Sequence, residues 1–386
     1  MGNNTAKVRC VIIGIGAMGR KYAIMIDRGE IEGMALAAVC CRNDESADWA
    51  AEHLNSSVRI FRGENEMYSC AEAFDAVIIT TPHRQHPAMA IRALKNGKNV
   101  LCDKPAGITV NDAAAINEAA GLSGKVFALM CNRRTYEQHV KIKNLLDNNE
   151  IGDLLRVTQV NSRNFRTQYY HSSGSWRSSW NGEGGGALMN QGYHLLDLWQ
   201  FYFGLPDSMY ADIPFGKYNG FSVDDEATLI MNYPDNMTGV FILTTGEGTN
   251  TDRLEIVGTR GRIILENKTV KLTKLSTDSK VYAAAAQVNA REELDETSEE
   301  FVFGEQEKAY QLVLKNFAEA VLYGTGLIAP GKESMQTLEL INGAYLSAWL
   351  GKKISLPINP EEYEKMLRIM EKSEKTTINL QISDTH

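Results

Sequence analysis

Three segments of this 386-residue chain carry side chains whose types and spacing suit chemistry. The first is Asp103-Lys104-Pro105, directly after the apolar run NVLC. Proline fixes the backbone of such a turn, and a partly desolvated lysine can act as a general acid or base because burial disfavours its charge. Alone, a lysine at a strand end is more often a solvated charge, so the neighbouring motifs must decide between the two interpretations.

The second segment is a predicted helix in which Asn190, His194 and Asp197 are spaced i, i+4 and i+7. This spacing places all three on one face of an α-helix. We favour the interpretation that His194 hydrogen-bonds a substrate hydroxyl while Asp197 orients its imidazole; the alternative is a buried histidine held by Asp197. The glycines at 184–186 precede this helix and predict a backbone that a ligand can approach closely.

The third segment is a G-x-G-x-x-G motif between a predicted strand at 8–13 and a predicted helix at 17–28. In this context the first glycine permits a tight turn, the second lets the backbone approach a pyrophosphate, and the third allows close helix packing. We therefore predict a dinucleotide-binding loop. Its residues are Gly14, Ile15, Gly16, Ala17, Met18 and Gly19.

The end of the second predicted strand bears on the choice of cofactor. The position where an acidic residue normally binds the ribose of NAD is Cys41, and Arg42 follows it. No carboxylate repels a 2′-phosphate there and a guanidinium can pair with one, which favours NADP slightly over NAD. The alternative is that Arg42 lies in solvent and that Asn43 or Asp44 binds the ribose.

The remaining cofactor contacts are expected from the loops after the third and fourth predicted strands, because ligands bind at the carboxyl ends of parallel strands. His83 and His86 are three residues apart, but nothing nearby completes a ligand set, so we predict no metal site. The predicted cofactor-binding residues outside the glycine loop are Cys41, Arg42, Thr80, Thr81, Pro82, His86, Asp103, Lys104 and Pro105.

The elements that must position these residues change type along the chain. Up to about residue 133, short apolar runs alternate with amphipathic stretches, which predicts a doubly wound parallel sheet. Beyond it, longer alternating strands predict a large open, mainly antiparallel sheet, with late helices at 305–322 and 333–350. We predict an α/β Rossmann domain at 1–133 and an α+β domain at 134–386.

Three further expectations concern the second domain. Its open sheet needs a cover, and a second copy of the chain would supply one, so we predict a homo-oligomer, either a dimer or a tetramer. Residues 276–300 are polar and alanine-rich and are expected to form a surface excursion. Residues 372–386 are expected to be a frayed tail.

Composition limits the class of protein further. The chain is 44% hydrophobic with a formal charge of −8, which argues against a disordered chain and against nucleic-acid binding. Apolar runs are about strand length, so we expect no membrane-spanning helix, and no signal peptide is apparent. The six cysteines form no C-x-x-C pair, which favours reduced thiols in a cytoplasmic protein.

Together these segments resemble the Gfo/Idh/MocA oxidoreductase family. The matching pieces are VIIGIGAMGR, VIITTPHRQH, GKNVLCDKPAG, GEGGGALMNQGYHLLD, SVDDEATLIMNYP and RLEIVGTRGRIILE. The resemblance implies an NAD(P)-dependent oxidoreductase of sugars, glycosides or cyclitols, with Lys104 near the reacting carbon and His194 as its acid/base partner. Many members carry an aspartate where this chain has Asn190, which leaves Lys104 and His194 as the pair. Oxidation of the 3-hydroxyl of a glycoside is the favoured reaction.

The second domain is expected to supply a sugar pocket, since aromatic faces suit sugar C–H surfaces and arginines suit hydroxyls. Alternatively, Trp176 and Trp180 only pack beneath this domain. Two other functions stay open: a redox-neutral glycosidase, in which transient oxidation at C3 permits elimination, and a non-catalytic sensor that binds cofactor and a protein partner. The predicted substrate-binding residues are Lys104, Asn132, Arg163, Arg166, Tyr169, Trp176, Arg177, Asn190, His194 and Asp197.

Overall fold

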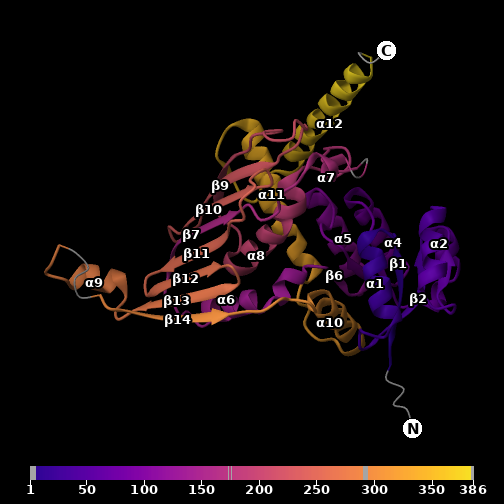
Figure 1. Cartoon of the computed structure of the whole chain (residues 1–386), viewed down its shortest axis with the longest axis horizontal. Coiled ribbons are helices and arrows are strands. Elements are labelled where there is room, and N and C mark those ends of the chain that lie inside the picture. The colour runs from indigo at the N-terminus through magenta and orange to yellow at the C-terminus, as the bar shows by residue number, and fades with distance from the viewer. Residues whose placement is uncertain (1–5, 173, 175, 290–293, 384–386) are drawn as a thin grey trace, which may run out of the picture. The chain divides into compact units, whose positions relative to one another are not determined.

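The chain folds into two compact units, each built around its own sheet (Figure 1). This computed structural model describes residues 6–172, 174, 176–289 and 294–383. The first unit comprises Met1–Thr135 and Glu307–Leu338, and the second comprises Tyr136–Gln306 and Glu339–His386. The chain therefore leaves the first unit after Thr135 and builds most of the second unit. It returns to the first unit at Glu307–Leu338 and ends in the second unit.

The first unit contains a six-stranded parallel sheet of order β3-β2-β1-β4-β5-β6, which confirms the predicted doubly wound fold. The strand order reverses between β1 and β4, and in such sheets ligands bind outside the carboxyl ends of the strands at this switch point. The strands are β1 (Val8–Ile13), β2 (Met34–Cys40), β3 (Arg59–Phe61), β4 (Ala76–Ile79), β5 (Asn99–Cys102) and β6 (Phe127–Leu129).

Helices cover this sheet, and one of them comes from late in the chain. Helix α10 (Ala309–Tyr323) buries Val313, Leu314 and Phe317 in the same core as Val8 and the other inward residues of β1. Full burial of such side chains contributes about 1.5–3 kcal/mol each. The other helices are α1 (Ala17–Asp27), α2 (Asp44–His53), α3 (Glu64–Ser69), α4 (His86–Lys95) and α5 (Val110–Ser123).

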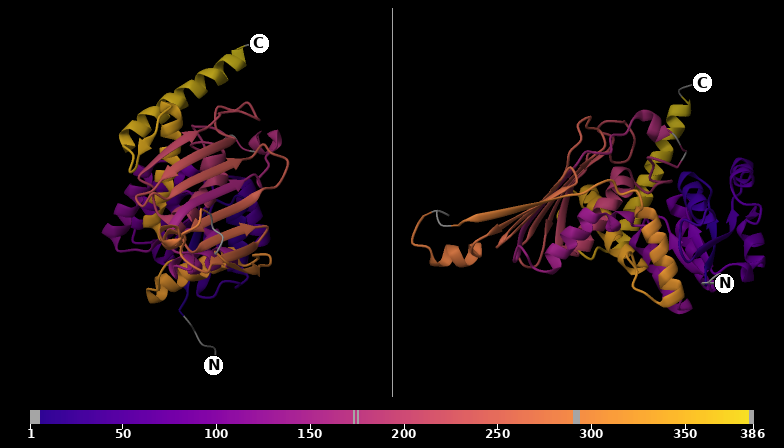
Figure 2. Two further views of the ribbon diagram at one scale, coloured as in Figure 1. Left: turned by 90° about the vertical axis from the view of Figure 1, so that its left-hand side faces the viewer. Right: turned by 60° about the horizontal axis from the view of Figure 1, so that its bottom comes forward.

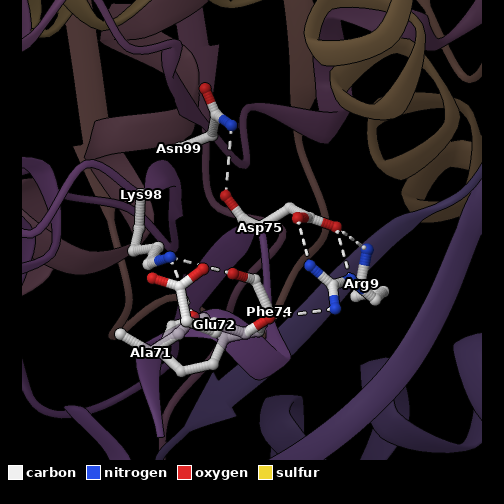
Figure 3. A network of polar contacts seen from close by, with 7 residues as sticks. All are labelled: Arg9, Ala71, Glu72, Phe74, Asp75, Lys98 and Asn99. Carbon is white, nitrogen blue, oxygen red and sulfur yellow. Dashed lines mark hydrogen bonds and ion pairs between the residues drawn. The ribbon is translucent and has the colours of Figure 1, made fainter. Parts of the chain in front are cut away.

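Polar contacts tie the strands together at the edge of the sheet opposite the glycine loop (Figure 3). Arg9 of β1 pairs with Asp75 just before β4, with Nη2–Oδ1 at 2.7 Å and Nε–Oδ2 at 3.0 Å. The amide of Asn99, which begins β5, donates to the carbonyl of Asp75 at 3.1 Å. Three neighbouring parallel strands are therefore joined where each begins.

The second unit contains a nine-stranded sheet of order β14-β13-β12-β11-β7-β10-β9-β8-β15. Neighbouring strands are antiparallel except β7 and β10, which are parallel, so the sheet is mixed and mainly antiparallel, as predicted. The strands are β7 (Leu154–Asn161), β8 (Ser208–Asp212), β9 (Glu226–Asn232), β10 (Thr238–Thr244), β11 (Asp252–Gly258), β12 (Gly261–Glu266), β13 (Thr269–Leu275), β14 (Glu296–Val302) and β15 (Ile354–Ser355).

One face of this sheet is buried and the other is open. Along β9 the side chains of Leu229 and Met231 are fully buried, whereas Ile230 between them is 47% exposed. In the left view of Figure 2 the central strands lie in front of the helices of the same unit. The helices are α6 (Glu137–Asp147), α7 (Gln168–Ser172), α8 (Tyr193–Phe203), α9 (Ser279–Ala285), α11 (Ser334–Leu350), which spans both units, and α12 (Pro360–Ser383).

The end of the chain differs from the prediction. The prediction of a frayed tail from residue 372 is wrong as far as Ser383, because α12 continues to that residue. Residues 384–386 lie outside the described part of the chain. The helix is held by buried Tyr363, Leu367 and Glu374. The excursion at 276–300 is largely exposed and contains α9 and most of β14, with 290–293 outside the described residues.

Candidate active site

The glycine loop lies between β1 and α1, held against β4. Gly14 has φ +93° and donates its N–H to the carbonyl of Cys40 at 3.0 Å. Thr80, just after β4, donates its hydroxyl to the carbonyl of Gly14 at 2.5 Å. A Cβ on Gly14 would lie 2.8 Å from Cγ2 of Thr81. Position 14 therefore requires glycine for both its positive φ and its packing.

The other two glycines of the motif have different surroundings. A Cβ on Gly19 would overlap the carbonyl oxygen of Gly14, so this glycine lets α1 pack closely on the loop. A Cβ on Gly16 would meet no heavy atom within 4 Å, so the backbone here faces open space. Gly16 is also the N-cap of α1 and supplies no side-chain hydrogen bond to the first amides. A pyrophosphate would fit this arrangement, because it needs close backbone approach and amide donors.

The residues after β2 are placed for contact with the outer part of a dinucleotide. Arg42 is exposed, and its guanidinium has no hydrogen-bond or ion-pair partner within the described ranges. It lines a shallow pocket of about 430 Å³ together with Arg84. Asn43 caps α2 by accepting from the amide of Ser46 at 2.9 Å, and Asp44 pairs with a neighbouring arginine. Asn43 and Asp44, the alternative ribose ligands, thus have structural partners, whereas the Arg42 guanidinium has none among the described residues.

His86 joins two of the predicted cofactor loops. Its Nδ1 lies 2.7 Å from the carbonyl oxygen of Pro105, and its Nε2 lies 2.5 Å from that of Thr81. The imidazole is 1% exposed, and burial lowers the pKa of His86 although the Pro105 carbonyl opposes this. The neutral ring carries one N–H and can donate to one carbonyl at a time. His86 therefore fixes the loop that carries Lys104 relative to the loop after β4.

The lysine loop follows β5 at the carboxyl edge of the sheet. Asp103 accepts a hydrogen bond from the backbone N–H of Lys104 at 2.8 Å, and the lysine side chain is half-buried. Burial raises the pKa of the Asp103 carboxyl, and the positive charge of Lys104 acts against this rise. A carboxyl next to the lysine gives the loop two titratable groups at the edge where a reacting group would bind.

In the second unit, two glycines of the run at 184–186 are required by internal packing. Gly185 has φ +149°, and a Cβ there would overlap the hydroxyl of Tyr345; a Cβ on Gly186 would overlap the carbonyl oxygen of Asp224. The glycines at 184–186 are buried. Gly185 and Gly186 therefore allow close packing on Tyr345 and Asp224, and close approach of a ligand to this backbone stays a prediction.

Buried Asp224 holds the segment after this run. Its carboxylate accepts from the backbone N–H of Gly186 at 2.8 Å and of Leu188 at 2.7 Å, and from the hydroxyl of Tyr345 at 2.6 Å. Burial raises the pKa of Asp224, while these hydrogen bonds act in the opposite direction. The carboxylate thus stabilises the amides that precede the His194 helix.

The assumption of one continuous α-helix from Asn190 to Asp197 is also wrong at its start. Residues Leu188–Gly192 form a π-helix, and α8 begins only at Tyr193. A π-turn is wider than an α-turn, so the i, i+4 relationship does not hold across it. Asn190 and His194 are half-buried, and Asp197 is 2% exposed. Such π-turns are frequent at functional sites.

A polar cluster that the sequence analysis missed surrounds Asn190. Three donors lie within hydrogen-bond distance of the Tyr170 hydroxyl, which can accept from two at a time: Arg177 Nη1 at 2.9 Å, Asn190 Nδ2 at 3.2 Å and Gln191 Nε2 at 3.1 Å. Asn190 Nδ2 also donates to the buried carboxylate of Glu183. The sequence signal that could have identified Glu183 is that it is the one acidic residue within the glycine-rich run at 182–186. Nothing local distinguished Tyr170 from Tyr169.

The other predicted substrate residues have varied surroundings. Tyr169 is 84% exposed, and exposed Arg163 lies 3.5 Å from Asp252. Trp176 is half-buried with the Arg177 guanidinium 4.7 Å from its ring. Asn132 is buried in a 3₁₀ turn of the first unit.

Trp180 packs in the interior of the second unit, as the alternative interpretation held for it. It is fully buried, and its ring lies 5.1 Å from that of Tyr345 and 5.2 Å from that of Trp349. Its Nε1 donates to the carbonyl of Ser222 at 2.9 Å. Trp180 therefore supports the segment that leads to Glu183 and is not available to a substrate.

Within the first unit, the structure brings the glycine loop, the Thr80–Thr81 loop and the Lys104 loop to one edge of the sheet. Within the second, it groups Arg177 with Asn190. The meeting of Lys104 with His194 stays a prediction. No group of three metal-binding side chains occurs among the described residues, and no helix in that part of the chain is long and apolar enough to cross a membrane.

The parallel sheet, its reversal of strand order and the glycine loop define a dinucleotide-binding Rossmann fold. The chain belongs to the Gfo/Idh/MocA oxidoreductase family: residues 8–130 match its NAD-binding Rossmann fold and residues 143–356 match its C-terminal alpha/beta domain. The motifs quoted from the sequence predicted this membership, and the two matches confirm it.

Individual relatives are distant. An alpha-N-acetylgalactosaminidase of Shewanella oneidensis and a glycosyl hydrolase family 109 protein of Shewanella sp. are each 27% identical over 191 residues. That match spans 47% of this chain and only 41% of each relative.

Similar solved structures cover nearly the whole chain and show the shared fold. The WlbA dehydrogenase of Bordetella pertussis, solved with NADH and UDP-GlcNAcA, has a TM-score of 0.75 at 21% identity and covers 92% of this chain and 100% of its own. The myo-inositol 2-dehydrogenase of Lactobacillus plantarum has a TM-score of 0.72 at 19% identity, covering 90% and 99%.

Proposed function

We propose that this member of an NAD-binding oxidoreductase family oxidises a secondary hydroxyl of a sugar, glycoside or cyclitol, with Lys104 and His194 as the acid/base pair. The observation that carries the proposal is the open backbone at Gly16 on the same sheet edge as the Lys104 loop. A group bound along that edge would extend from the glycine loop towards the lysine. The neighbours solved with NADH and a sugar nucleotide, or named for an inositol, support the same class of substrate.

The chemistry divides between cofactor and protein. A nicotinamide supplies hydride acceptance at C4, and the protein supplies position and proton transfer. In the proposed site, Lys104 or His194 takes the proton of the substrate hydroxyl as the carbinol carbon loses hydride. Asn190 cannot shuttle a proton, since its amide does not titrate. We favour the 3-hydroxyl of a glycosyl ring as the group oxidised.

Arg42 supports a preference for NADP. Its guanidinium has no partner within the described residues and lines a pocket together with Arg84. A 2′-phosphate would give it a charge-assisted hydrogen bond.

A redox-neutral glycosidase is the second candidate, because two of the relatives are named as an alpha-N-acetylgalactosaminidase and a family 109 glycosyl hydrolase. Oxidation at C3 would then be transient and would permit elimination at the glycosidic bond. Release of free sugar without net cofactor reduction distinguishes this function from that of a dehydrogenase.

The open face of the second sheet supports a homo-oligomer. The face carries exposed Ile230 and a ladder of ion pairs, in which Arg253 lies 3.0 Å from both Glu255 and Glu266 and Arg156 pairs with Glu255. Because these charges are paired among themselves, a second copy can cover the face with little uncompensated charge. Light scattering at micromolar concentration tests this, and a pure monomer would count against it.

The test of the function is a panel of sugars, glycosides and cyclitols incubated with NAD⁺ or NADP⁺. Cofactor reduction is followed by absorbance, and free sugar is followed in parallel. A dehydrogenase reduces cofactor in proportion to product, whereas a glycosidase releases sugar at constant cofactor redox state. A panel in which cofactor binds and neither product appears would refute both.

A further inference from the structure

Arg166 carries a positive charge that nothing in the described residues neutralises. Its guanidinium lies over the ring of Tyr170, with Cζ 4.3 Å from the ring centroid. Its Nε is buried without an acceptor, and no carboxylate in the described ranges pairs with it. A buried donor left without a partner destabilises the folded state. Such a group in a folded protein calls for an explanation, and a bound ligand is one.

A second guanidinium lies over the same ring. Arg177 has its Cζ 4.8 Å from the Tyr170 centroid and donates to the Tyr170 hydroxyl at 2.9 Å. It also lies 3.9 Å from Glu183, whose carboxylate accepts from the backbone N–H of Ser178 at 2.8 Å. Arg177 therefore has a buried carboxylate beside it, whereas no carboxylate among the described residues pairs with Arg166.

His171 adds an imidazole to this cluster. Its Nδ1 lies 2.5 Å from the hydroxyl of Ser178, and its Nε2 is buried without a partner among the described residues. Burial lowers the pKa of His171; the charges of Arg166 and Arg177 lower it further, and Asp225 opposes them. The ring is thus neutral near pH 7. The tautomer whose Nδ1 accepts from Ser178 has its N–H at Nε2, which is a second donor without an acceptor.

We propose that the substrate carries an anionic group, a carboxylate or a phosphate, which binds Arg166 and Arg177 at the edge of the Tyr170 ring. This rests on the proposed function, since it names the class of sugar that the site accepts. An anionic oxygen gives Arg166 Nε its missing acceptor and gives its guanidinium the ion-pair partner that it lacks among the described residues. A neutral hydroxyl would accept the hydrogen bond but would leave the Arg166 guanidinium without an ion-pair partner, so an anion is the better match for Arg166.

The test compares sugars that differ in charge. Methyl glucuronide is paired with methyl glucoside, and glucose 6-phosphate with glucose, with galacto analogues in each set. We expect the anionic member of at least one pair to have a KM lower by about tenfold or more, the effect of one charge-assisted hydrogen bond. The two pairs distinguish a carboxylate from a phosphate. Raising the salt concentration weakens binding of the anionic member only.

Arg166→Gln should raise KM for the anionic sugar by about tenfold or more, with little change in kcat and no change for the neutral partner. Arg166→Lys keeps the positive charge and should restore part of the difference in KM between the anionic sugar and its neutral partner. Arg368→Gln is the matched control, because Arg368 is an exposed arginine of the same unit, on α12. Calorimetric titration of methyl glucuronide, with and without cofactor, measures binding directly.

Equal KM values within every pair would overturn the proposal. An equal rise in KM for neutral and anionic sugars in Arg166→Gln would overturn it as well. Failure of the proposed function gives a different result. If methyl glucuronide binds in an Arg166-dependent way and no sugar is oxidised or cleaved, the anion site stands and the oxidoreductase proposal falls.

Discussion

Glu374 and Asn181 are 193 residues apart and joined by two hydrogen bonds: Glu374 Oε2 accepts from the backbone N–H of Asn181 at 3.0 Å and from its Nδ2 at 2.8 Å. The other carboxylate oxygen accepts from the backbone N–H of Trp180 at 3.0 Å and the hydroxyl of Ser222 at 2.7 Å. The C-terminal helix thus holds the turn that leads to Glu183 in the polar cluster.

The Glu374 anchor predicts a stability loss. Glu374→Ala leaves the buried backbone N–H of Trp180 and the partly buried N–H of Asn181 without their acceptor, and should lower the free energy of unfolding by about 1–3 kcal/mol. Glu374→Gln keeps one acceptor oxygen and should lower the free energy of unfolding by less. Urea unfolding measures both, with Glu362→Ala as control, since Glu362 is exposed on the same helix. Unchanged stability in Glu374→Ala would refute the anchoring role.

The two glycines at either side of the first turn of α1 should respond differently to alanine. Gly19→Ala places a Cβ against the Gly14 carbonyl and should destabilise the first unit by about 1–3 kcal/mol. Gly16→Ala meets no neighbour, so stability should stay within about 1 kcal/mol of the parent, while a pyrophosphate loses its close approach. Urea unfolding and fluorescence titration of the cofactor separate the two effects. Normal cofactor affinity in Gly16→Ala would contradict the proposed binding mode.

Arg42 predicts cofactor selectivity. Arg42→Ala should weaken the binding of NADP⁺ by about tenfold or more, because one charge-assisted hydrogen bond is lost. The affinity for NAD⁺ should stay nearly unchanged. Fluorescence titration with both cofactors measures the ratio, and Arg28→Ala, an exposed arginine after α1, is the control. Tight NAD⁺ binding by the parent protein without NADP⁺ binding would refute the preference.

The ion pair in Figure 3 predicts a pH dependence of stability. Hydrogen bonding by Arg9 lowers the pKa of Asp75 from its ordinary value of 3.8. A lowered folded-state pKa gives stability that is present above the ordinary value and is lost as pH falls through the folded value. Because both side chains are more than a third exposed, the contribution is about 1 kcal/mol or less. Urea unfolding should show Asp75→Asn less stable at neutral pH, with the difference shrinking in acid. A difference that stays constant would exclude the pair as its cause.

The acid/base pair predicts a loss of turnover. Lys104→Ala and His194→Ala should each reduce kcat by about 100-fold or more, the usual contribution of general acid–base catalysis, while the cofactor still binds. Steady-state kinetics and cofactor titration measure the two quantities separately. Near-normal turnover in either variant removes that residue from the mechanism.

Several features could be predicted from sequence because their determinants are local. The glycine loop needs only a strand, a turn and a helix start in sequence order, and these follow one another from β1 to α1. The alternation of buried and open positions also reveals the type of each sheet, since side chains change faces at every residue of a strand. The position of Asn190 relative to His194 could not be predicted, because the π-turn between them leaves no such periodic signal in the sequence.

The sequence by itself determined the family, the Rossmann fold, the cofactor loop and the candidate lysine and histidine, all of which depend on short runs of residues. Only the tertiary structure decided that the glycines before the π-helix pack against Tyr345 and Asp224, that α10 returns to the first core, and that Arg166 has no ion-pair partner in the described part of the chain. Each of these depends on residues far apart in the chain, and no local pattern records which distant groups will share a buried site.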